Sequence, residues 1–308
     1  MLSSFSIVGT NVLIIFILII VGFFCGKIKM ITDESVKGMN SIMLNIVTPC
    51  VIISSLQQEF DATLLKNFFL AVLSAVISHA LSFVIGFLII RDKDESRRKT
   101  LQFAAMFSNC GFMALPLIEA ICGSEGLIYG AAYILVFNFI GWTYGISMMS
   151  GTKEVSIKKA LINPGVIPSI IGLVLFIFSI SLPDIILTPM EHFAGLNTPV
   201  PMLIIGYTIS QLKFEDFFKL KDIFAALLIR LIITPAALMA VLYLIGIRGI
   251  LFTTAIISAS TPVAAMTTMF AIKFDRDYSL GSKLVAVSSL FSVFTMTVIV
   301  SVAKFLSV

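Results

Sequence analysis

Long apolar runs separated by short charged stretches make up most of the chain. Ten runs are long enough to cross a bilayer as helices, because a crossing takes roughly 20 residues at the helical rise. They cover residues 8–27, 37–56, 64–90, 99–121, 126–150, 162–181, 185–211, 222–246, 249–272 and 279–304. The pattern predicts an all-α polytopic membrane protein with ten transmembrane helices.

Two of these runs are interrupted in the middle by a proline and a cluster of small or polar residues. The fourth contains Ser108-Asn109-Cys110-Gly111 and then Pro116, and the ninth contains Ser258-Ala259-Ser260-Thr261-Pro262. Proline has no N–H and frees backbone carbonyls, which inside a bilayer must find partners or line a wet cavity. Paired interruptions are typical of the binding sites of secondary transporters. The alternative is a pair of simple kinks.

The composition fits a membrane protein. Of 308 residues, 58% are hydrophobic and 12% are charged, which is too little charge for the surface of a soluble domain of this size. No Lys or Arg precedes the first run and no small-residue cleavage site follows it, so we expect a retained helix rather than a signal peptide. The four cysteines lie apart, without the spacing of a metal site, so no metal and no other cofactor is expected.

The distribution of basic residues predicts the orientation. Of the 21 Lys and Arg residues, 17 lie in or beside the loops after the first, third, fifth, seventh and ninth runs. Three lie on the opposite side, and Arg230 lies within a run. Because Lys and Arg favour the cytoplasmic side, we expect a multi-pass protein of the cytoplasmic membrane with both termini extracytoplasmic.

Five runs precede the basic stretch at residues 153–159 and five follow it, so the two halves would cross the membrane with opposite topology. Such inverted repeats are common in secondary transporters. Corresponding places in the two halves carry similar motifs. The second run contains Asn45-Ile46-Val47-Thr48-Pro49, and the seventh contains Asn197-Thr198-Pro199.

The ninth run contains the signals of a helix start inside the membrane. Ser260 and Thr261 are good N-cap residues, and Pro262 suits the first helical position. If the breaks of the fourth and ninth runs cross near the midplane, two half-helix N-termini with partial positive charge converge there. An anion is then the natural occupant of the crossing.

The stretch Asn109-Cys110-Gly111-Phe112-Met113-Ala114-Leu115-Pro116-Leu117, followed by Gly123-Ser124-Glu125-Gly126, Tyr129 and Tyr133, resembles the auxin efflux carrier family. That family includes plant auxin carriers and bacterial permeases for small organic acids. Ala114 stands where glycine is more usual in the motif. The resemblance covers nearly the whole chain, and the short central loop is similar to that of the compact bacterial members.

The resemblance implies a fold like that of the bile-acid sodium symporters, with ten helices, two inverted five-helix repeats and crossed broken helices 4 and 9. It implies a scaffold of helices 1–2 (residues 1–60) and 6–7 (156–215). Beside it would lie a transport unit of helices 3–5 (61–155) and 8–10 (216–308). Transport would be an elevator-like movement of this unit, and a homodimer would form through the scaffold helices.

The predicted substrate site comprises Asn109, Gly111, Pro116, Ser260, Thr261, Pro262, Asn45 and Asn197. Asn109 offers a donor and an acceptor beside the first break, either to a substrate or to an interhelical hydrogen bond. The two prolines would shape the crossing. Asn45 and Asn197 would face the cavity from the scaffold, or else serve packing and capping near the local prolines.

Three ionisable residues are candidates for ion coupling: Glu119, His79 and Arg230. Burial would suit Glu119 to carry a proton, and a place in the outer vestibule is the alternative. His79 would relay protons or, as the favoured interpretation, pack as a neutral histidine. Arg230 would attract a carboxylate or, as the favoured interpretation, extend toward the cytoplasm about two turns away.

We expect a secondary transporter that moves a small organic anion, a mono- or dicarboxylate similar to malate or auxin. The chain has no Gly-x-x-x-x-Gly-Lys-Ser/Thr phosphate loop, so ATP is not expected to drive transport directly. Uniport, proton symport and sodium symport stay open. Sodium is the less favoured coupling ion, because the fourth and ninth runs carry few carboxylates.

A ligand-binding membrane receptor or sensor without net transport is the alternative, although no cytoplasmic output domain is evident. A membrane-embedded enzyme ranks third, because the chain has two histidines and neither His-Glu-x-x-His nor Gly-x-Ser-x-Gly. The expected partners are the lipid bilayer and the organic anion, and no nucleic acid is expected to bind.

Overall fold

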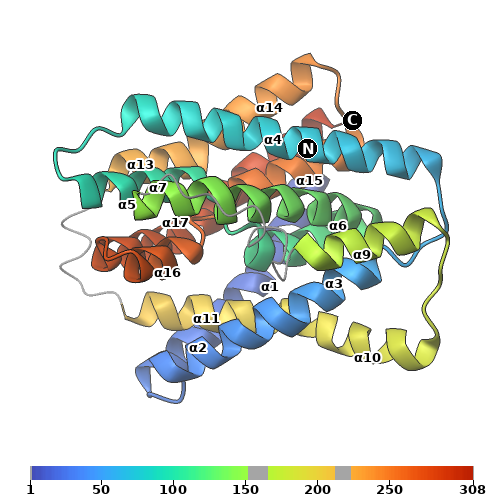
Figure 1. Ribbon diagram of the computed structural model, residues 1–308, viewed down its shortest axis with the longest axis horizontal. Helices are drawn as coiled ribbons and strands as arrows, with labels where there is room; N and C mark the ends of the chain where they lie inside the picture. The colour runs from blue at the N-terminus through green and yellow to red at the C-terminus, as the bar shows by residue number, and fades with distance from the viewer. Residues whose placement is uncertain (1, 152–165, 212–222, 308) are drawn as a thin grey trace.

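A computed structural model describes residues 2–151, 166–211 and 223–307, and every regular element in these ranges is a helix (Figure 1). The first half contains α1 (Leu2–Lys27), α2 (Asp33–Ile42), α3 (Thr48–Ser55), α4 (Ala62–Ile89), α5 (Glu95–Met106), α6 (Leu115–Ile140) and α7 (Ile146–Ser150). Between them lie the π-helical turns η1 (Met43–Val47), η2 (Cys110–Ala114) and η3 (Gly141–Gly145).

The second half contains α9 (Val166–Ile177), α10 (Asp184–Ala194), the 3₁₀ turn η4 (Gly195–Asn197), α11 (Pro199–Ser210), α13 (Phe224–Leu228), the π-helical turn η6 (Ile229–Ile233), α14 (Thr234–Leu244), α15 (Gly249–Ser260), α16 (Met266–Lys273) and α17 (Tyr278–Leu306). As far as the described ranges reach, each of the ten predicted spans contains helix. The boundaries agree to within a few residues.

Polar N-caps fix where several helices begin. Side-chain oxygens of Thr32, Asp61, Asp94 and Asp277 accept from backbone N–H groups in the first turns of α2, α4, α5 and α17. A helix leaves its first four N–H groups without partners, so each cap stabilises one particular start.

Gly123 bends α6 at the boundary predicted between the fourth and fifth runs. Its backbone has φ 66° and ψ −159°, a conformation essentially restricted to glycine. The segments of α6 before and after Gly123 therefore correspond to parts of two different predicted spans.

Three prolines follow π-helical turns at the same spacing. η1 ends two residues before Pro49, η2 two residues before Pro116, and η6 two residues before Pro235. Proline lacks the N–H that would bond the carbonyl four residues earlier, and its ring clashes with that carbonyl. The wider π turn relieves this clash, so these prolines widen a continuing helix rather than break it.

The described turns gather at the two ends of the bundle (Figure 1). Residues 28–32, 90–94 and 274–277 lie at one end, and residues 56–61 and 178–183 lie at the other. The three turns at the first end contain the basic residues Lys29, Arg91, Lys93 and Arg276, the two at the second end contain none, and the turn between α14 and α15 contains Arg248. This is the arrangement expected if the first end faces the cytoplasm, and the orientation itself stays a prediction.

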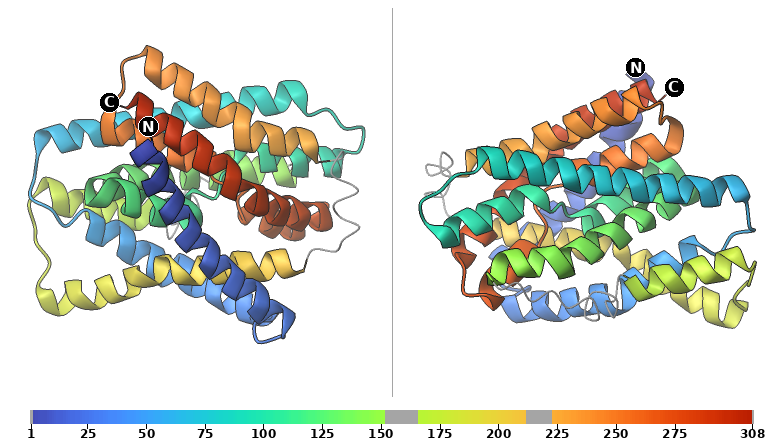
Figure 2. Two further views of the ribbon diagram at one scale, coloured as in Figure 1. Left: turned by 180° about the vertical axis from the view of Figure 1, so that it is seen from behind. Right: turned by 45° about the horizontal axis from the view of Figure 1, so that its top comes forward.

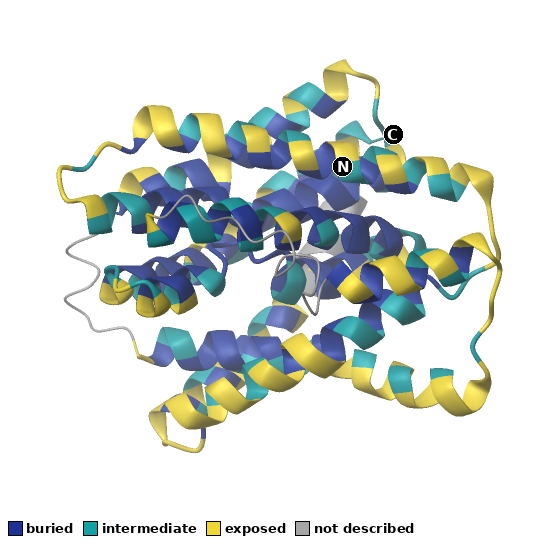
Figure 3. Cartoon of the chain, in the orientation of Figure 1, coloured by how far each residue is buried: buried dark blue, intermediate teal, exposed yellow. Residues whose placement is uncertain are grey.

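The outer faces of the bundle are apolar, and the buried residues gather in its middle (Figure 3). Large exposed side chains include Phe69, Leu88, Phe178, Ile185 and Phe294. Such a surface suits lipid rather than water. Within the described residues, five helical stretches are long and apolar enough to cross a membrane: Asp33–Ser55, Ala62–Ile89, Cys110–Ser150, Phe224–Leu244 and Tyr278–Leu306.

Three shorter apolar helices accompany these five stretches: Leu13–Lys27, Val166–Ile177 and Gly249–Ser260. The architecture is therefore that of an all-α polytopic membrane protein. The count of ten crossings and the inverted repeat stay predictions.

Helices α1 and α11 pack with their backbones almost touching, and α17 packs against both (Figure 2). A Cβ atom on Gly206 would collide with the carbonyl oxygen of Ile19, and one on Gly22 would collide with that of Leu203. Lipid removes most of the hydrophobic contribution to helix association, so close contact at small residues supplies it instead.

Replacement of Gly206 by alanine should destabilise the protein. The added methyl group must push α1 and α11 apart, and overpacking of this kind costs about 1–3 kcal/mol. We expect Gly206→Ala to lower the melting temperature of detergent-purified protein. Gly38 in α2 is the matched control, because a Cβ there would meet nothing within 4 Å. Equal melting of Gly206→Ala and Gly38→Ala would contradict the close contact.

Candidate functional site

The breaks predicted in the fourth and ninth runs lie against each other. Ser108 and Val263 form an isolated antiparallel β-bridge. Two backbone hydrogen bonds flank this bridge, from the Asn109 N–H to the Pro262 carbonyl (2.8 Å) and from the Ala264 N–H to the Phe107 carbonyl (2.9 Å). The segments 107–109 and 261–264 therefore pair where α5 passes into η2 and where α15 passes into α16. We call this pairing the crossing.

The first break precedes the π-helical turn. α5 ends at Met106, Phe107 is extended, and Asn109 (φ −79°, ψ 53°) lies outside the helical region. Pro116 lies in the first turn of α6, beyond the five residues of η2. The missing N–H of Pro116 affects η2, which directly follows the break, and the role of Pro116 in shaping the crossing stays a prediction.

The second break differs from the prediction in how its hydroxyl groups are used. The side chains of Ser260 and Thr261 donate to carbonyls three residues earlier in α15, at 3.0 Å and 2.9 Å. They do not cap the next half-helix, which begins at Met266. The physical reason is distance along the chain, because an N-cap side chain bonds an N–H two or three residues later and α16 begins only at Met266. A residue before proline is also pushed out of the helical region. Thr261 is extended (ψ 154°), and this extension produces the segment that pairs with the first break.

Beyond the crossing, two half-helices begin: η2, which continues into α6, and α16. The side chain of Asn109 is 7% exposed, and its amide has no hydrogen-bond partner in the described part of the chain. A Cβ atom on Gly111 would meet nothing within 4 Å, so the space beside the first break is open. Asn109 and Gly111 therefore lie together at a helix start that carries partial positive charge.

Ser288 of α17 supports the crossing and was not predicted. Its hydroxyl accepts a hydrogen bond from the Val263 N–H at 3.0 Å. This backbone group would otherwise be unsatisfied in an apolar surrounding. The cluster of serines in the last apolar run was the available signal in the sequence.

Arg230 lies on η6, is 1% exposed, and binds carbonyl groups of both broken helices. Its guanidinium donates to the carbonyls of Met106 (3.1 Å), Ala105 (3.4 Å) and Ala259. The favoured interpretation, extension toward the cytoplasm, is wrong. The carbonyls at the ends of α5 and α15 have no helical N–H partners and therefore accept these bonds inside the protein.

The other two coupling candidates differ in burial. His79 is buried in α4, its Nδ1 lies 2.8 Å from the Ala75 carbonyl, and its ring centroid lies 5.5 Å from that of Tyr133. This surrounding fits the favoured interpretation of a packing histidine. Glu119 is exposed on α6, so the burial on which its proposed proton role depended is absent.

The matched motifs of the second and seventh runs also meet, because η1 packs against η4. Asn45 is exposed, and its amide donates to the Ser41 carbonyl of its own helix at 2.8 Å, which fits a local capping role. Asn197 is 2% exposed, and its Oδ1 has no hydrogen-bond partner among the described residues. Asn197, unlike Asn45, therefore retains an unused buried acceptor.

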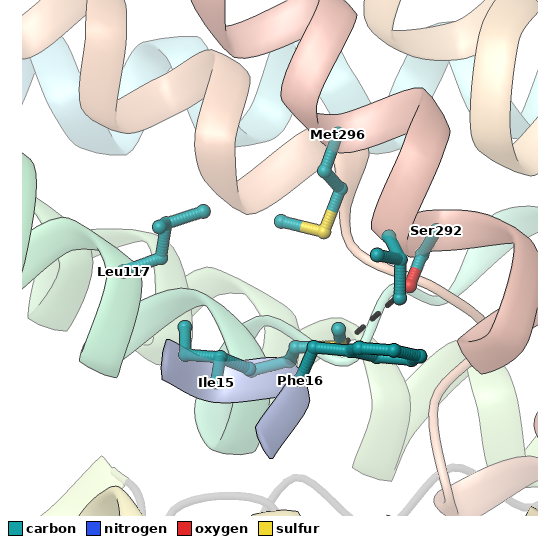
Figure 4. A pocket seen from close by; sticks show the side chains of 7 residues that line it. Ile15, Phe16, Leu117, Ser292 and Met296 are labelled. Carbon is teal, nitrogen blue, oxygen red and sulfur yellow. Dashed lines mark hydrogen bonds between the residues drawn. The ribbon is translucent and has the colours of Figure 1, made fainter. Parts of the chain in front are cut away.

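A cavity of about 10 Å³ lies between α1, the η2–α6 segment and α17 (Figure 4). Its walls include Ile15 and Phe16 of α1, Leu117 of α6, and Ser292, whose hydroxyl donates to the Met113 sulfur at 3.9 Å. This volume is roughly that of one water molecule. Any larger guest on this side of η2 requires α1 and α17 to separate or these side chains to move.

An apolar exterior, a buried polar centre and two interrupted helices that bond to each other define an α-helical membrane protein. Residues 7–300 match the family described as membrane transport protein (Mem_trans), and the chain belongs to that family. The resemblance to the auxin efflux carrier family is thereby confirmed. The protein is an integral membrane protein of a transport family, which fits the expectation that it is not an enzyme.

Relatives named as transporters match nearly the whole chain. An uncharacterized transporter of Methanothermobacter thermautotrophicus is 26% identical, over 93% of this chain and 95% of the relative. The uncharacterized transporter MJ1031 of Methanocaldococcus jannaschii is 25% identical, over 91% of this chain and 94% of the relative. The uncharacterized transporter YfdV of Escherichia coli K12 is 21% identical, over 96% and 98%.

A disulfide should form across the crossing in the variant Ser108→Cys/Val263→Cys. The two flanking hydrogen bonds make this a non-hydrogen-bonded antiparallel pair, whose Cα atoms lie about 4.5 Å apart, within disulfide range. The four native cysteines are first replaced by alanine. Mild oxidation should then remove both thiols, as measured by mass spectrometry, and leave each single variant unchanged. Persistent free thiols in the double variant would show that the breaks do not meet.

Proposed function

We propose that the protein is a secondary transporter that moves a small organic anion, a mono- or dicarboxylate, across the cytoplasmic membrane. The observation that carries this proposal is the backbone pairing of segments 107–109 and 261–264. It brings the starts of η2 and α16 to one place inside the bundle. Each helix N-terminus carries about +0.5 elementary charge, so two of them beside one site favour an anion.

The residues beside the crossing supply the contacts that a carboxylate needs. The Asn109 amide has donors to offer to a carboxylate oxygen, and the open space beside Gly111 lets the carboxylate approach the backbone. Asn197 supplies a buried acceptor from the scaffold side for a hydroxyl or protonated group of the substrate. Asn45 takes no part, because its amide is already bonded within its own helix.

Alternating access is proposed to be elevator-like, in ten spans that form two inverted repeats. The close contact between α1 and α11 supports a rigid scaffold of residues 1–60 and 156–215. The backbone pairing at the crossing and the carbonyl contacts of Arg230 support a rigid transport unit of residues 61–155 and 216–308. The cavity between α1 and α17 lies where the two bodies would separate to admit the anion.

Purified protein in liposomes should take up a labelled organic anion. The panel comprises malate, succinate, lactate and indole-3-acetate, each tested without a gradient and then with an imposed proton or sodium gradient. We expect saturable uptake of at least one anion, with stimulation by the proton gradient rather than the sodium gradient if transport is coupled. Binding without flux would favour the receptor alternative, and neither binding nor flux for any anion would reject the anion proposal.

Removal of the Asn109 amide should weaken anion binding while leaving the protein folded. A hydrogen bond to a charged group contributes about 1.5–3 kcal/mol, so Asn109→Ala should weaken the affinity of the best-bound anion roughly tenfold or more. The matched control is Asn40→Ala in α2, which removes another partly buried amide whose oxygen has no partner in the described residues. Equal affinities for Asn109→Ala and Asn40→Ala, measured by calorimetry, would exclude Asn109 as a ligand.

A further inference from the structure

Arg230 is a buried cation that pairs with no carboxylate in the described part of the chain. Its guanidinium contacts backbone carbonyls alone. The titratable side chains that interact with it electrostatically are Cys110, His79 and Tyr133, and none of them is an acid that would be ionised at neutral pH. An isolated charge is costly inside a membrane protein, so the surrounding backbone must compensate it.

Two helix C-termini provide this compensation. Ala105 and Met106 are the last two residues of α5, and Ala259 is the last but one of α15. The last four carbonyls of a helix have no N–H partners, and a helix C-terminus carries about −0.5 elementary charge. The planar guanidinium presents five donors in a fixed fork, so one side chain reaches both ends.

Four helix ends lie at the crossing, and their partial charges can be summed. α5 and α15 end there, and η2 and α16 begin there. With about −0.5 at each C-terminus and +0.5 at each N-terminus, the helix ends alone sum to about zero. The helix ends therefore favour an anion only locally, beside the two N-termini, and add no net charge to the crossing as a whole. Arg230 adds one full positive charge, which raises the sum to about +1.

We infer that Arg230 is a positioning residue of the crossing, which ties the ends of α5 and α15 together and gives the site its net positive charge without touching the transported anion. The terminal nitrogens of its guanidinium are bonded to three carbonyls of these helix ends, and its Nε is buried without a hydrogen-bond partner among the described residues. The inference rests on the proposed function only in naming an anion as the occupant. The tie and the charge are properties of the crossing itself.

The charge acts over a short distance. The Cα atoms of Met106, whose carbonyl accepts from Arg230, and of Asn109, beside the open space, are three residues apart and so at most about 11 Å from each other. The guanidinium lies one hydrogen bond beyond Met106, which places the charge on the order of 10–15 Å from Asn109. A unit charge at that distance, with an effective dielectric constant of about 20, changes the affinity for an anion roughly tenfold. An effect of this size is measurable without a direct contact.

A thiol placed beside the crossing tests the charge without any substrate. The probe is Asn109→Cys in a background in which the native cysteines are alanine, and N-ethylmaleimide alkylates it between pH 7 and 10. The thiolate is the reactive form, so the rate reports its titration midpoint. When Arg230→Gln is added to this variant, the titration midpoint of the thiol at position 109 should rise by about one pH unit. One pH unit corresponds to the same free energy as a tenfold change in anion affinity. Arg230→Lys keeps the charge and should move it by much less.

A second pair of variants leaves Arg230 in place, in case Arg230→Gln does not fold. Thr234 is 0% exposed and lies about one turn after Arg230, on the same side of the helix. Thr234→Glu places a carboxylate beside the guanidinium and should raise the midpoint as Arg230→Gln does. Thr234→Gln has the same shape without the charge and should not.

The outcomes separate this inference from the proposed function. An upward shift in Arg230→Gln or Thr234→Glu, with little shift in Arg230→Lys or Thr234→Gln, supports the inference even if no anion in the liposome panel is transported. Equal shifts in the charged and uncharged variants, or no shift in any of them, would overturn it even if transport is found. Anion uptake that depends on Asn109 with an unmoved midpoint would keep the proposed function and reject the role of Arg230.

Discussion

A helix that is interrupted inside a bilayer exposes backbone N–H and C=O groups that lipid cannot satisfy. In this protein each interruption satisfies the other. The extended segments 107–109 and 261–264 exchange two backbone hydrogen bonds, and Ser288 accepts from the remaining N–H of Val263. Helices α4, α6, α14 and α17 pack around this point and enclose a polar centre. The pairing offsets the free-energy cost of burying the backbone groups of this centre. In this structure each break therefore supplies the partners of the other, through the Asn109 N–H, the Pro262 carbonyl, the Ala264 N–H and the Phe107 carbonyl.

The positions of the helices and of the two breaks could be predicted from the sequence, because they follow from the lengths of the apolar runs and from the positions of the prolines. The apolar runs located the helices to within a few residues, and the proline–polar clusters located both breaks. The predicted roles of individual side chains were wrong where a tertiary contact outweighed the local preference of the residue. Thr261 is a good N-cap by propensity, yet the next helix begins five residues later at Met266, and the Thr261 hydroxyl instead donates to a carbonyl of α15.

Arg230 is a second residue whose tertiary partners could not be predicted from the sequence. From the sequence its distance to the cytoplasmic end was short enough for extension, and nothing marked the carbonyls of Ala105 or Ala259 as its partners. Those carbonyls lie more than 120 and about 30 positions away in the chain, and only the crossing brings them together. The close approach of α1 and α11 at Gly206 could not be predicted for the same reason, because a glycine in an apolar run does not indicate which residue of another helix it contacts.

The crossing is also unequal on its two sides, and this inequality decides where a ligand can lie. On the C-terminal side, the carbonyls of α5 and α15 are occupied by Arg230 and by the hydroxyls of Ser260 and Thr261. On the N-terminal side, the amide of Asn109 is unpartnered in the described residues, and the space beside Gly111 is open. Among the described residues, an unpartnered amide and open space therefore lie together at Asn109 and Gly111, whereas the unpartnered Arg230 Nε and Ser258 hydroxyl are buried near the ends of α5 and α15. The interactions that satisfy the carbonyls at the ends of α5 and α15 thus leave the Asn109 amide and the space beside Gly111 unoccupied among the described residues.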